Sequence, residues 1–169
     1  MLDKPPLVVD TDFLSSFAWI RRLDILENLF RVKMIILEQV HTEIARVPHL
    51  CTQVEQCIQN GAILPVTIYA DAPEAIELAR YLDEGRYGQG EAACMAYLKH
   101  NEGTMGSNNL SDVGHFCSTN QKSLICSSDC LVYALKSRLL DLQTCESIWQ
   151  RMLKHQMLPA ATFAEYLSG

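Results

Sequence analysis

The sequence predicts an α/β fold, a three-layer sandwich in which helices flank a mainly parallel central sheet. Short apolar runs without alternation, such as residues 7–9, are typical of strands that are covered on both faces. These runs alternate with segments whose apolar residues recur at helical spacing, an arrangement that indicates a parallel sheet. The 169 residues then form a single domain, in which residues 144–169 are a C-terminal helical extension packed on the rest.

In the first half of the chain, strands and helices alternate. Strands are expected at residues 7–9, 34–37 and 62–69. Helices are expected at residues 13–30, 39–46 and 48–60. Pro65 weakens the third strand because proline cannot donate to a sheet. Asn60-Gly61 is a typical C-terminal stop for the third helix.

The second half continues the pattern. Helices are expected at residues 73–84, 91–100, 110–120, 131–137, 144–153 and 159–167. One further strand is expected at residues 123–126, and residues 103–107 are expected to form a loop. Gly85-x-x-Gly-x-Gly separates two of these helices, since glycine disfavours the helix interior.

Composition and charge exclude several classes of protein. Hydrophobic residues make up 49% and charged residues 20%, which is globular rather than disordered composition. No apolar run is long enough for a membrane span, and no signal peptide is apparent, so we expect a cytoplasmic protein. The net charge of −6 argues against broad electrostatic capture of nucleic acid. Seven cysteines without Cys-x-x-Cys spacing, and histidines without zinc-helix spacing, favour free thiols over a disulfide or zinc framework.

Acidic residues follow two of the predicted strands. Asp10 and Asp12 come directly after the first strand, and Asp129 follows the strand at 123–126. Open α/β sheets bind ligands outside the carboxyl ends of their strands. Carboxylates gathered there repel one another unless a cation such as Mg²⁺ or Mn²⁺ neutralises them. Asp12 and Asp129 could instead cap the helices that follow them.

Glu91 is a further candidate for this site. It follows Gly88-Gln89-Gly90 and opens an alanine-rich helix, and Gly90 permits a close approach of the backbone. The alternative is a surface acid that the helix dipole favours in the first turn.

These motifs together resemble the PIN domain family. The resemblance rests on Asp10-Thr-Asp12 after an apolar strand, on Gly-Gln-Gly-Glu91 and on Ser-Ser-Asp129. Members of the family are metal-dependent ribonucleases and include VapC-like toxins of toxin–antitoxin pairs. The resemblance implies Mg²⁺ or Mn²⁺ as cofactor and hydrolysis of RNA phosphodiester bonds. It also implies an RNA substrate, an antitoxin protein as partner and a homodimer.

The resemblance assigns roles to individual residues. Asp10, Glu91 and Asp129 would be the catalytic residues and metal ligands, with Asp12 and Ser128 in support. Many members carry a second acid directly after the counterpart of Asp129, where this chain has a cysteine, Cys130.

Two more acids are candidate ligands under this resemblance. Asp112 could replace the missing acid, or could simply be an acid at a helix start. Glu43 matches an acid that some toxin members carry on the helix after their second strand, or is a solvated helix residue. Few basic residues are available to contact phosphate; the candidates are Arg21, Arg22, Arg31, Lys33 and Lys122.

Two alternatives stay open. The chain could be a catalytically degenerate PIN-like module that binds an antitoxin or another subunit through the helices at 13–30 and 48–60. It could also be a phosphatase of the haloacid dehalogenase type, with Asp10 as nucleophile and Asp12 as acid/base. Leu14 departs from the motif of that second family.

Overall fold

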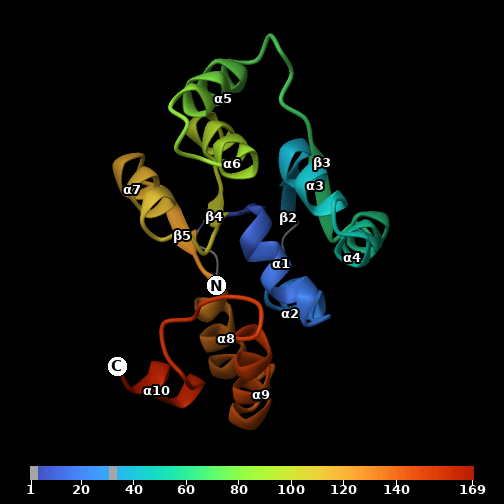
Figure 1. Ribbon diagram of the computed structural model, residues 1–169, viewed down its shortest axis with the longest axis vertical. Coiled ribbons are helices and arrows are strands. Elements are labelled where there is room, and N and C mark those ends of the chain that lie inside the picture. The colour runs from blue at the N-terminus through green and yellow to red at the C-terminus, as the bar shows by residue number, and fades with distance from the viewer. Residues whose placement is uncertain (1–3, 31–33) are drawn as a thin grey trace.

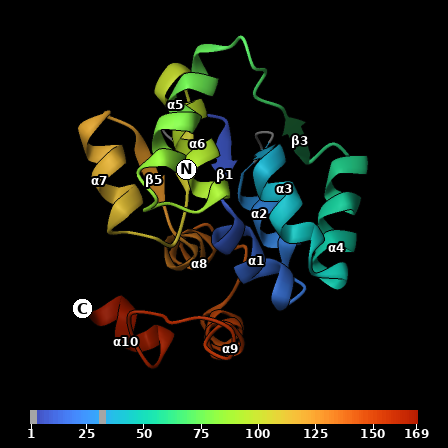
Figure 2. The ribbon, with the colours of Figure 1, turned by 45° about the horizontal axis from the view of Figure 1, so that its top comes forward.

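The central sheet of the molecule has five parallel strands in the order β3-β2-β1-β4-β5. The computed structural model describes residues 4–30 and 34–169. The strands are β1 (Leu7–Val9), β2 (Met34–Leu37), β3 (Ile63–Val66), β4 (Thr104–Gly106) and β5 (Ser123–Ile125). Helices flank the sheet (Figures 1 and 2), so the predicted α/β sandwich is confirmed.

Ten helices are present in the described part of the chain. They are α1 (Thr11–Trp19), α2 (Leu23–Leu29), α3 (Glu38–Ala45), α4 (Pro48–Gln59), α5 (Pro73–Asp83), α6 (Gln89–His100), α7 (Asp112–Thr119), α8 (Ser127–Lys136), α9 (Leu142–Met152) and α10 (Phe163–Ser168). Among these helices, none has the length and apolar character needed to cross a membrane.

The strand order creates one topological switch point. From β1 the chain adds β2 and then β3 on one side, and it later returns to place β4 on the other side of β1. The connections that leave β1 and β4 therefore diverge in opposite directions. In open α/β sheets, the crevice at such a divergence, outside the carboxyl ends of the strands, is where ligands bind. Here the connections diverge beyond Val9 and Gly106.

The helix expected over residues 13–30 is two helices. Arg21 has a φ of 57°, in the left-handed region, and its N–H donates to the carbonyl of Ala18 at 3.0 Å. The next N–H, of Arg22, donates to the carbonyl of Phe17 at 2.9 Å. Such a left-handed residue ends a helix by satisfying its last carbonyls. The prediction failed because the apolar pattern continues across the break into the buried Leu23.

The prediction of a loop over residues 103–107 is wrong, because this segment contains β4. Thr104 pairs with Leu7 and Gly106 with Val9, next to the centre of the sheet. The strand escaped notice because it has only one large apolar residue, Met105. Gly106 is required by packing, since a Cβ there would lie 3.1 Å from the ring of Phe13. The strands at residues 7–9 and 34–37 have the predicted ends, and the other predicted elements are present with shifted ends.

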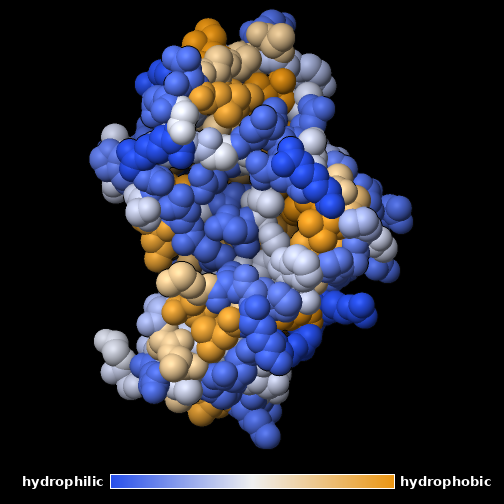
Figure 3. Space-filling view, in the orientation of Figure 1, coloured by the Kyte–Doolittle hydropathy of each residue, from blue (hydrophilic) through white to orange (hydrophobic). Residues whose placement is uncertain are grey.

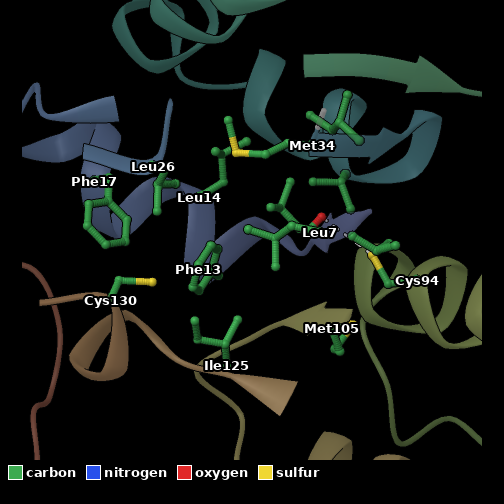
Figure 4. Packing of buried hydrophobic residues seen from close by; sticks show 14 of the residues in the cluster. Leu7, Phe13, Leu14, Phe17, Leu26, Met34, Cys94, Met105, Ile125 and Cys130 are labelled. Carbon is green, nitrogen blue, oxygen red and sulfur yellow. Dashed lines mark hydrogen bonds between the residues drawn. The ribbon is translucent and has the colours of Figure 1, made fainter. Parts of the chain in front are cut away.

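The core packs between the sheet and α1 (Figure 4). Phe13 and Phe17 are fully buried, and each side chain of that size contributes about 1.5–3 kcal/mol on burial. Cys130 is also fully buried and points toward Phe13. The cysteine that directly follows Asp129 is therefore a core residue, turned away from solvent.

The C-terminal helices α9 and α10 pack around Trp149. This side chain is fully buried, and its indole N–H donates to the carbonyl of Ala160 at 3.0 Å. Its ring stacks on Tyr166 with 5.1 Å between centroids. Between the two helices, Gln156 reaches back and donates to the Ser127 hydroxyl at 3.3 Å. The extension is thereby tied to the start of α8.

Candidate metal centre

Asp10 lies at the switch point, directly after β1, and is the N-cap of α1. Its Oδ1 accepts a 2.9 Å hydrogen bond from the N–H of Phe13. The side chain is fully buried. Its second oxygen, Oδ2, accepts no hydrogen bond from any residue that the structure describes. A buried carboxylate oxygen without a partner is costly, so this atom calls for a ligand.

The environment of Asp10 opposes its ionisation. Burial raises the pKa of this carboxyl well above its usual range, and the nearby charge of Asp12 raises it further. The Ser107 hydroxyl and the Phe13 N–H act in the opposite direction but do not prevail. A nearby cation would reverse this balance, because opposite charge favours the carboxylate.

Three carboxylates converge at this point. Oxygen atoms of Asp10, Asp12 and Glu91 all lie within 4.8 Å of one another. Asp10 is buried, Glu91 is half-buried and Asp12 is exposed, so the group opens to solvent on one side. In the described part of the chain, no Lys, Arg or His forms an ion pair with any of them. An oxygen-only donor set with one orphan oxygen fits a hard divalent cation such as Mg²⁺ or Mn²⁺.

Glu43, on α3, contacts the residues next to two members of this group. Its Oε1 accepts a 3.1 Å hydrogen bond from the N–H of Gly90, and its Oε2 accepts one from the Thr11 hydroxyl. It is thus held between the start of α1 and the start of α6. In Figure 1, α1, α3 and α6 approach one another near the centre of the molecule, and hydrophilic residues cover most of that region in Figure 3.

The pKa of the Cys94 thiol is affected by all four acidic residues near the site. This thiol is fully buried on α6 and donates to the carbonyl of Val9 at 3.5 Å. Burial raises its pKa well above the ordinary value, and the carboxylates nearby add to the shift; they are Asp10, Glu43, Glu91 and Asp12. The four acids therefore act on one place.

Comparisons with protein-family models, curated proteins and solved structures find no match to this chain. We therefore infer the function from the geometry and chemistry of the site.

Asp129 does not belong to the three-carboxylate group. Its Oδ2 accepts hydrogen bonds from the N–H of Cys126 at 3.0 Å and from the Cys126 thiol at 3.1 Å. This is the capping-box position of α8. Asp129 follows β5, which is two strands from β1, and its carboxylate makes no hydrogen bond to Asp10, Asp12 or Glu91 in the described part of the chain. Two strand spacings, about 10 Å, separate β5 from β1. Ser128, expected in support, is buried beside Asp129 in the first turn of α8.

Asp112 also lies outside the group, and its carboxylate forms an ion pair with Arg86. The guanidinium of Arg86 donates to its Oδ1, with Nε at 2.8 Å, and this contact lowers the pKa of the Asp112 carboxyl. Asp112 is connected to the site only indirectly. The amide of Asn109 donates to Oε1 of Glu91 at 2.8 Å and to Oδ2 of Asp112 at 3.5 Å.

The basic residues expected to contact phosphate lie away from the carboxylates or outside the description. Arg21 and Arg22 follow the far end of α1, about 14 Å from its start at 1.5 Å per residue. Arg22 is paired with Asp24 at 2.9 Å. Lys122 precedes β5, at the amino edge of the sheet, and donates to the carbonyl of Asn101 at 3.0 Å. Arg31 and Lys33 fall outside the described residues.

The polar residues that follow β4 were missed by the sequence analysis. Ser107 acts on Asp10, and Asn109 binds Glu91. Asn108 accepts from the N–H of Ser127 at 2.9 Å and donates to the Ser16 hydroxyl at 2.9 Å. The run Ser107-Asn108-Asn109 carries the signal, but only once β4 is known to lie beside β1.

Proposed function

We propose that this chain is a Mg²⁺- or Mn²⁺-dependent ribonuclease of the PIN-like kind. The observation that carries the proposal is the convergence of Asp10, Asp12 and Glu91 at the switch point of a parallel sheet. The buried Oδ2 of Asp10, which has no partner among the described residues, adds to it, since a cation would satisfy this oxygen and compensate the buried charge.

The residues divide the work by their positions. Asp10, Asp12 and Glu91 would hold the cation, and Glu43 adds negative charge beside them. Such a cation supplies water of lowered pKa and neutralises charge on a scissile phosphate. Asp12 is the exposed carboxylate of the group, so it is placed to accept a proton at the solvent side. Asn109 orients Glu91 through its amide.

The charge distribution limits how RNA would bind. The protein has a net charge of −6, and no basic side chain of the described residues pairs with the site carboxylates. A long duplex would be repelled, because affinity for nucleic acid depends on cationic contacts to phosphate. We therefore propose that the substrate is a short, single-stranded RNA segment, whose phosphate is bound by the metal ion.

A second candidate is a PIN-like module that binds a protein and does not cleave RNA. It is favoured by Asp129, which lies outside the three-carboxylate group, and by the scarcity of basic residues near the carboxylates. Exposed apolar residues near α5 offer a surface for such a partner: Ile76 is 74% and Tyr69 71% exposed. Hydrophobic residues gather over this end of the molecule in Figure 3.

Mn²⁺ titration followed by calorimetry, with an RNA-cleavage assay on the same preparations, tests the proposal. The variants are Asp10→Asn and Glu91→Gln, each of which removes one charge with little change in shape. Asp83→Asn is the matched control, because Asp83 is exposed at the end of α5. We expect one saturable Mn²⁺ site and metal-dependent cleavage in the wild type and the control, and neither in the two site variants.

The other outcomes decide between the alternatives. Mn²⁺ binding without cleavage of single-stranded RNA, but with hydrolysis of a phosphomonoester, would overturn the ribonuclease in favour of a phosphatase. Absence of Mn²⁺ binding in the wild type would leave the protein-binding module. Cleavage that persists in Asp10→Asn would show that it arises from a contaminating nuclease.

A further inference from the structure

A second cluster of metal-ligating side chains lies between α3 and α4, apart from the acidic site. Ligand atoms of His41, Cys51 and Glu55 lie within 4.8 Å of one another. His41 comes from α3, and the other two come from α4. Cys51 and Glu55 are four residues apart, so they share one face of the helix. The three side chains thus meet across a helix pair that the chain connects by only a short turn.

The contacts inside this cluster are already close to a coordination arrangement. Nε2 of His41 lies 2.6 Å from Oε1 of Glu55. Two ligand atoms of a tetrahedral Zn²⁺ lie roughly 3.3–3.7 Å apart, given metal–ligand bonds of about 2.0–2.3 Å. To hold one ion between them, the imidazole and the carboxylate would have to move apart from 2.6 Å to that spacing. An ion then replaces the proton that the two groups share.

The donor chemistry selects the metal. One imidazole nitrogen, one thiolate and one carboxylate are a mixed N, S and O set, which suits Zn²⁺ and not the hard cations Mg²⁺ or Ca²⁺. The charges also balance, since a thiolate and a carboxylate together neutralise a divalent ion. The acidic site differs in both respects, because it has oxygen donors only.

The cluster is accessible, unlike the other thiols of the protein. Of the seven cysteines, six are buried and only Cys51 is partly exposed. All three ligands are half-buried. Cys51 and Glu55 also line a surface pocket of about 650 Å³, together with Pro48 and Thr52. Three protein ligands beside an open pocket leave the fourth tetrahedral position to water or to a ligand from solution.

We propose that His41, Cys51 and Glu55 bind Zn²⁺, with the fourth coordination position open to the pocket. The ion ties α3 to α4. The same helix α3 also carries Glu43, which faces Gly90 and the acidic site, so the two sites share a helix but no ligand. The zinc site is independent of the proposed ribonuclease activity.

Co²⁺ titration tests the site directly, because cobalt reports its ligands by colour. A thiolate ligand gives a charge-transfer band in the near ultraviolet, and tetrahedral geometry gives strong visible bands. We expect one equivalent of Co²⁺ to produce both in the wild type, and one equivalent of Zn²⁺ to abolish them. Zn²⁺ should also raise the thermal unfolding midpoint, because it binds the folded state.

Two variants and two controls interpret the spectra. Cys51→Ser should lose the charge-transfer band. His41→Asn removes a ligand itself, so it should weaken Zn²⁺ binding by more than the roughly 10–100-fold that loss of a hydrogen-bond partner of a ligand costs. His49 is an exposed histidine on α4, the helix that carries Cys51, so His49→Asn should change neither the cobalt band nor the Zn²⁺ affinity. Asp10→Asn should also keep the cobalt spectrum, and this result separates the zinc site from the acidic one.

Either of two results would overturn the proposal. The first is a wild type that shows no saturable, one-to-one binding of Co²⁺ or Zn²⁺, in which case the contact between His41 and Glu55 is a hydrogen bond and no more. The second is a cobalt spectrum that persists in a Cys51→Ser protein with wild-type circular dichroism. That spectrum would place the metal on other residues.

Discussion

The backbone N–H of Gly90 donates a 3.1 Å hydrogen bond to Oε1 of Glu43, and a Cβ at position 90 would lie 2.7 Å from the other oxygen of the same carboxylate. Glycine is therefore what allows this carboxylate to sit against the start of α6. The same missing Cβ would lie 2.8 Å from the Thr11 hydroxyl. Three elements, α1, α3 and α6, depend on this one small residue for their closest approach.

Gly90→Ala should therefore damage both stability and the acidic site. The added methyl group displaces the Glu43 carboxylate, which then loses its hydrogen bonds from the Gly90 N–H and the Thr11 hydroxyl, at a cost of about 1 kcal/mol each. Chemical denaturation measures that loss, and calorimetry should show weaker Mn²⁺ binding. Gly114→Ala is the matched control, since Gly114 is also helical and its Cβ would come no closer than 3.8 Å to Leu124. That variant should gain about 0.5–1 kcal/mol, because alanine is the better helix former. Equal losses in the two variants would contradict the argument.

The raised pKa of Asp10 predicts a pH-dependent stability. Protonated Asp10 stabilises the fold, and this contribution is complete below its unfolded pKa of about 4 and is lost as the pH rises through the higher folded pKa. Asp10→Asn cannot ionise and keeps an N-cap acceptor for Phe13. In the presence of a chelator, the variant should therefore equal the wild type at pH 4 and exceed it in stability increasingly toward pH 7.

Denaturation of both proteins across that pH range, with and without Mn²⁺, measures the effect. Saturating Mn²⁺ at pH 7 should raise the stability of the wild type and not that of Asp10→Asn, because only the carboxylate holds the ion. If the stability difference between the wild type and Asp10→Asn did not change with pH, the inference that ionised Asp10 is a buried, uncompensated charge would be wrong.

Asp129→Ala separates a helix cap from a metal ligand. The carboxylate of Asp129 accepts from the N–H of Cys126, and loss of such a capping contact costs about 1 kcal/mol. We expect a lower unfolding midpoint and Mn²⁺ affinity within about twofold of the wild type, since Asp129 is not in the carboxylate group. Loss of Mn²⁺ binding in a folded Asp129→Ala protein would restore the arrangement that the sequence motif implied.

The fold was predictable where apolar patterning carries the information. The runs at β1, β2 and β5 alternate with amphipathic helices, and this alternation is enough for a parallel α/β sheet. Strand β4 was not predictable in this way, because it is only three residues long, has a single large apolar residue and ends in glycine, which is depleted in strands. Its strand character comes from pairing with β1 and β5, which is a tertiary effect.

The same limit explains what was predicted of the site. Asp10, Asp12 and Glu91 could be proposed from their positions after a strand and at a helix start, and the structure brings these three together. Asp129 was proposed because it also follows a strand. Strand order decides which strand ends are neighbours, and local sequence does not encode it. Without β4, the contribution of Asn109 could not be seen.

The last prediction concerns Asn109. Its amide donates a hydrogen bond to Glu91 and, among the described residues, to no other member of the three-carboxylate group. Partners that orient a metal ligand typically contribute 10–100-fold to affinity, so Asn109→Ala should weaken Mn²⁺ binding by about that factor. Asn120→Ala is the control, since among the described residues its amide donates only to the carbonyl of Phe116 on its own helix. Calorimetry on both variants measures the ratio. Asp112→Asn should have little effect on Mn²⁺ affinity, because Arg86 already neutralises that carboxylate. If Asp112→Asn instead abolished binding while Asn109→Ala did not, the metal would be held by Asp112, and Glu91 would be an ordinary first-turn acid.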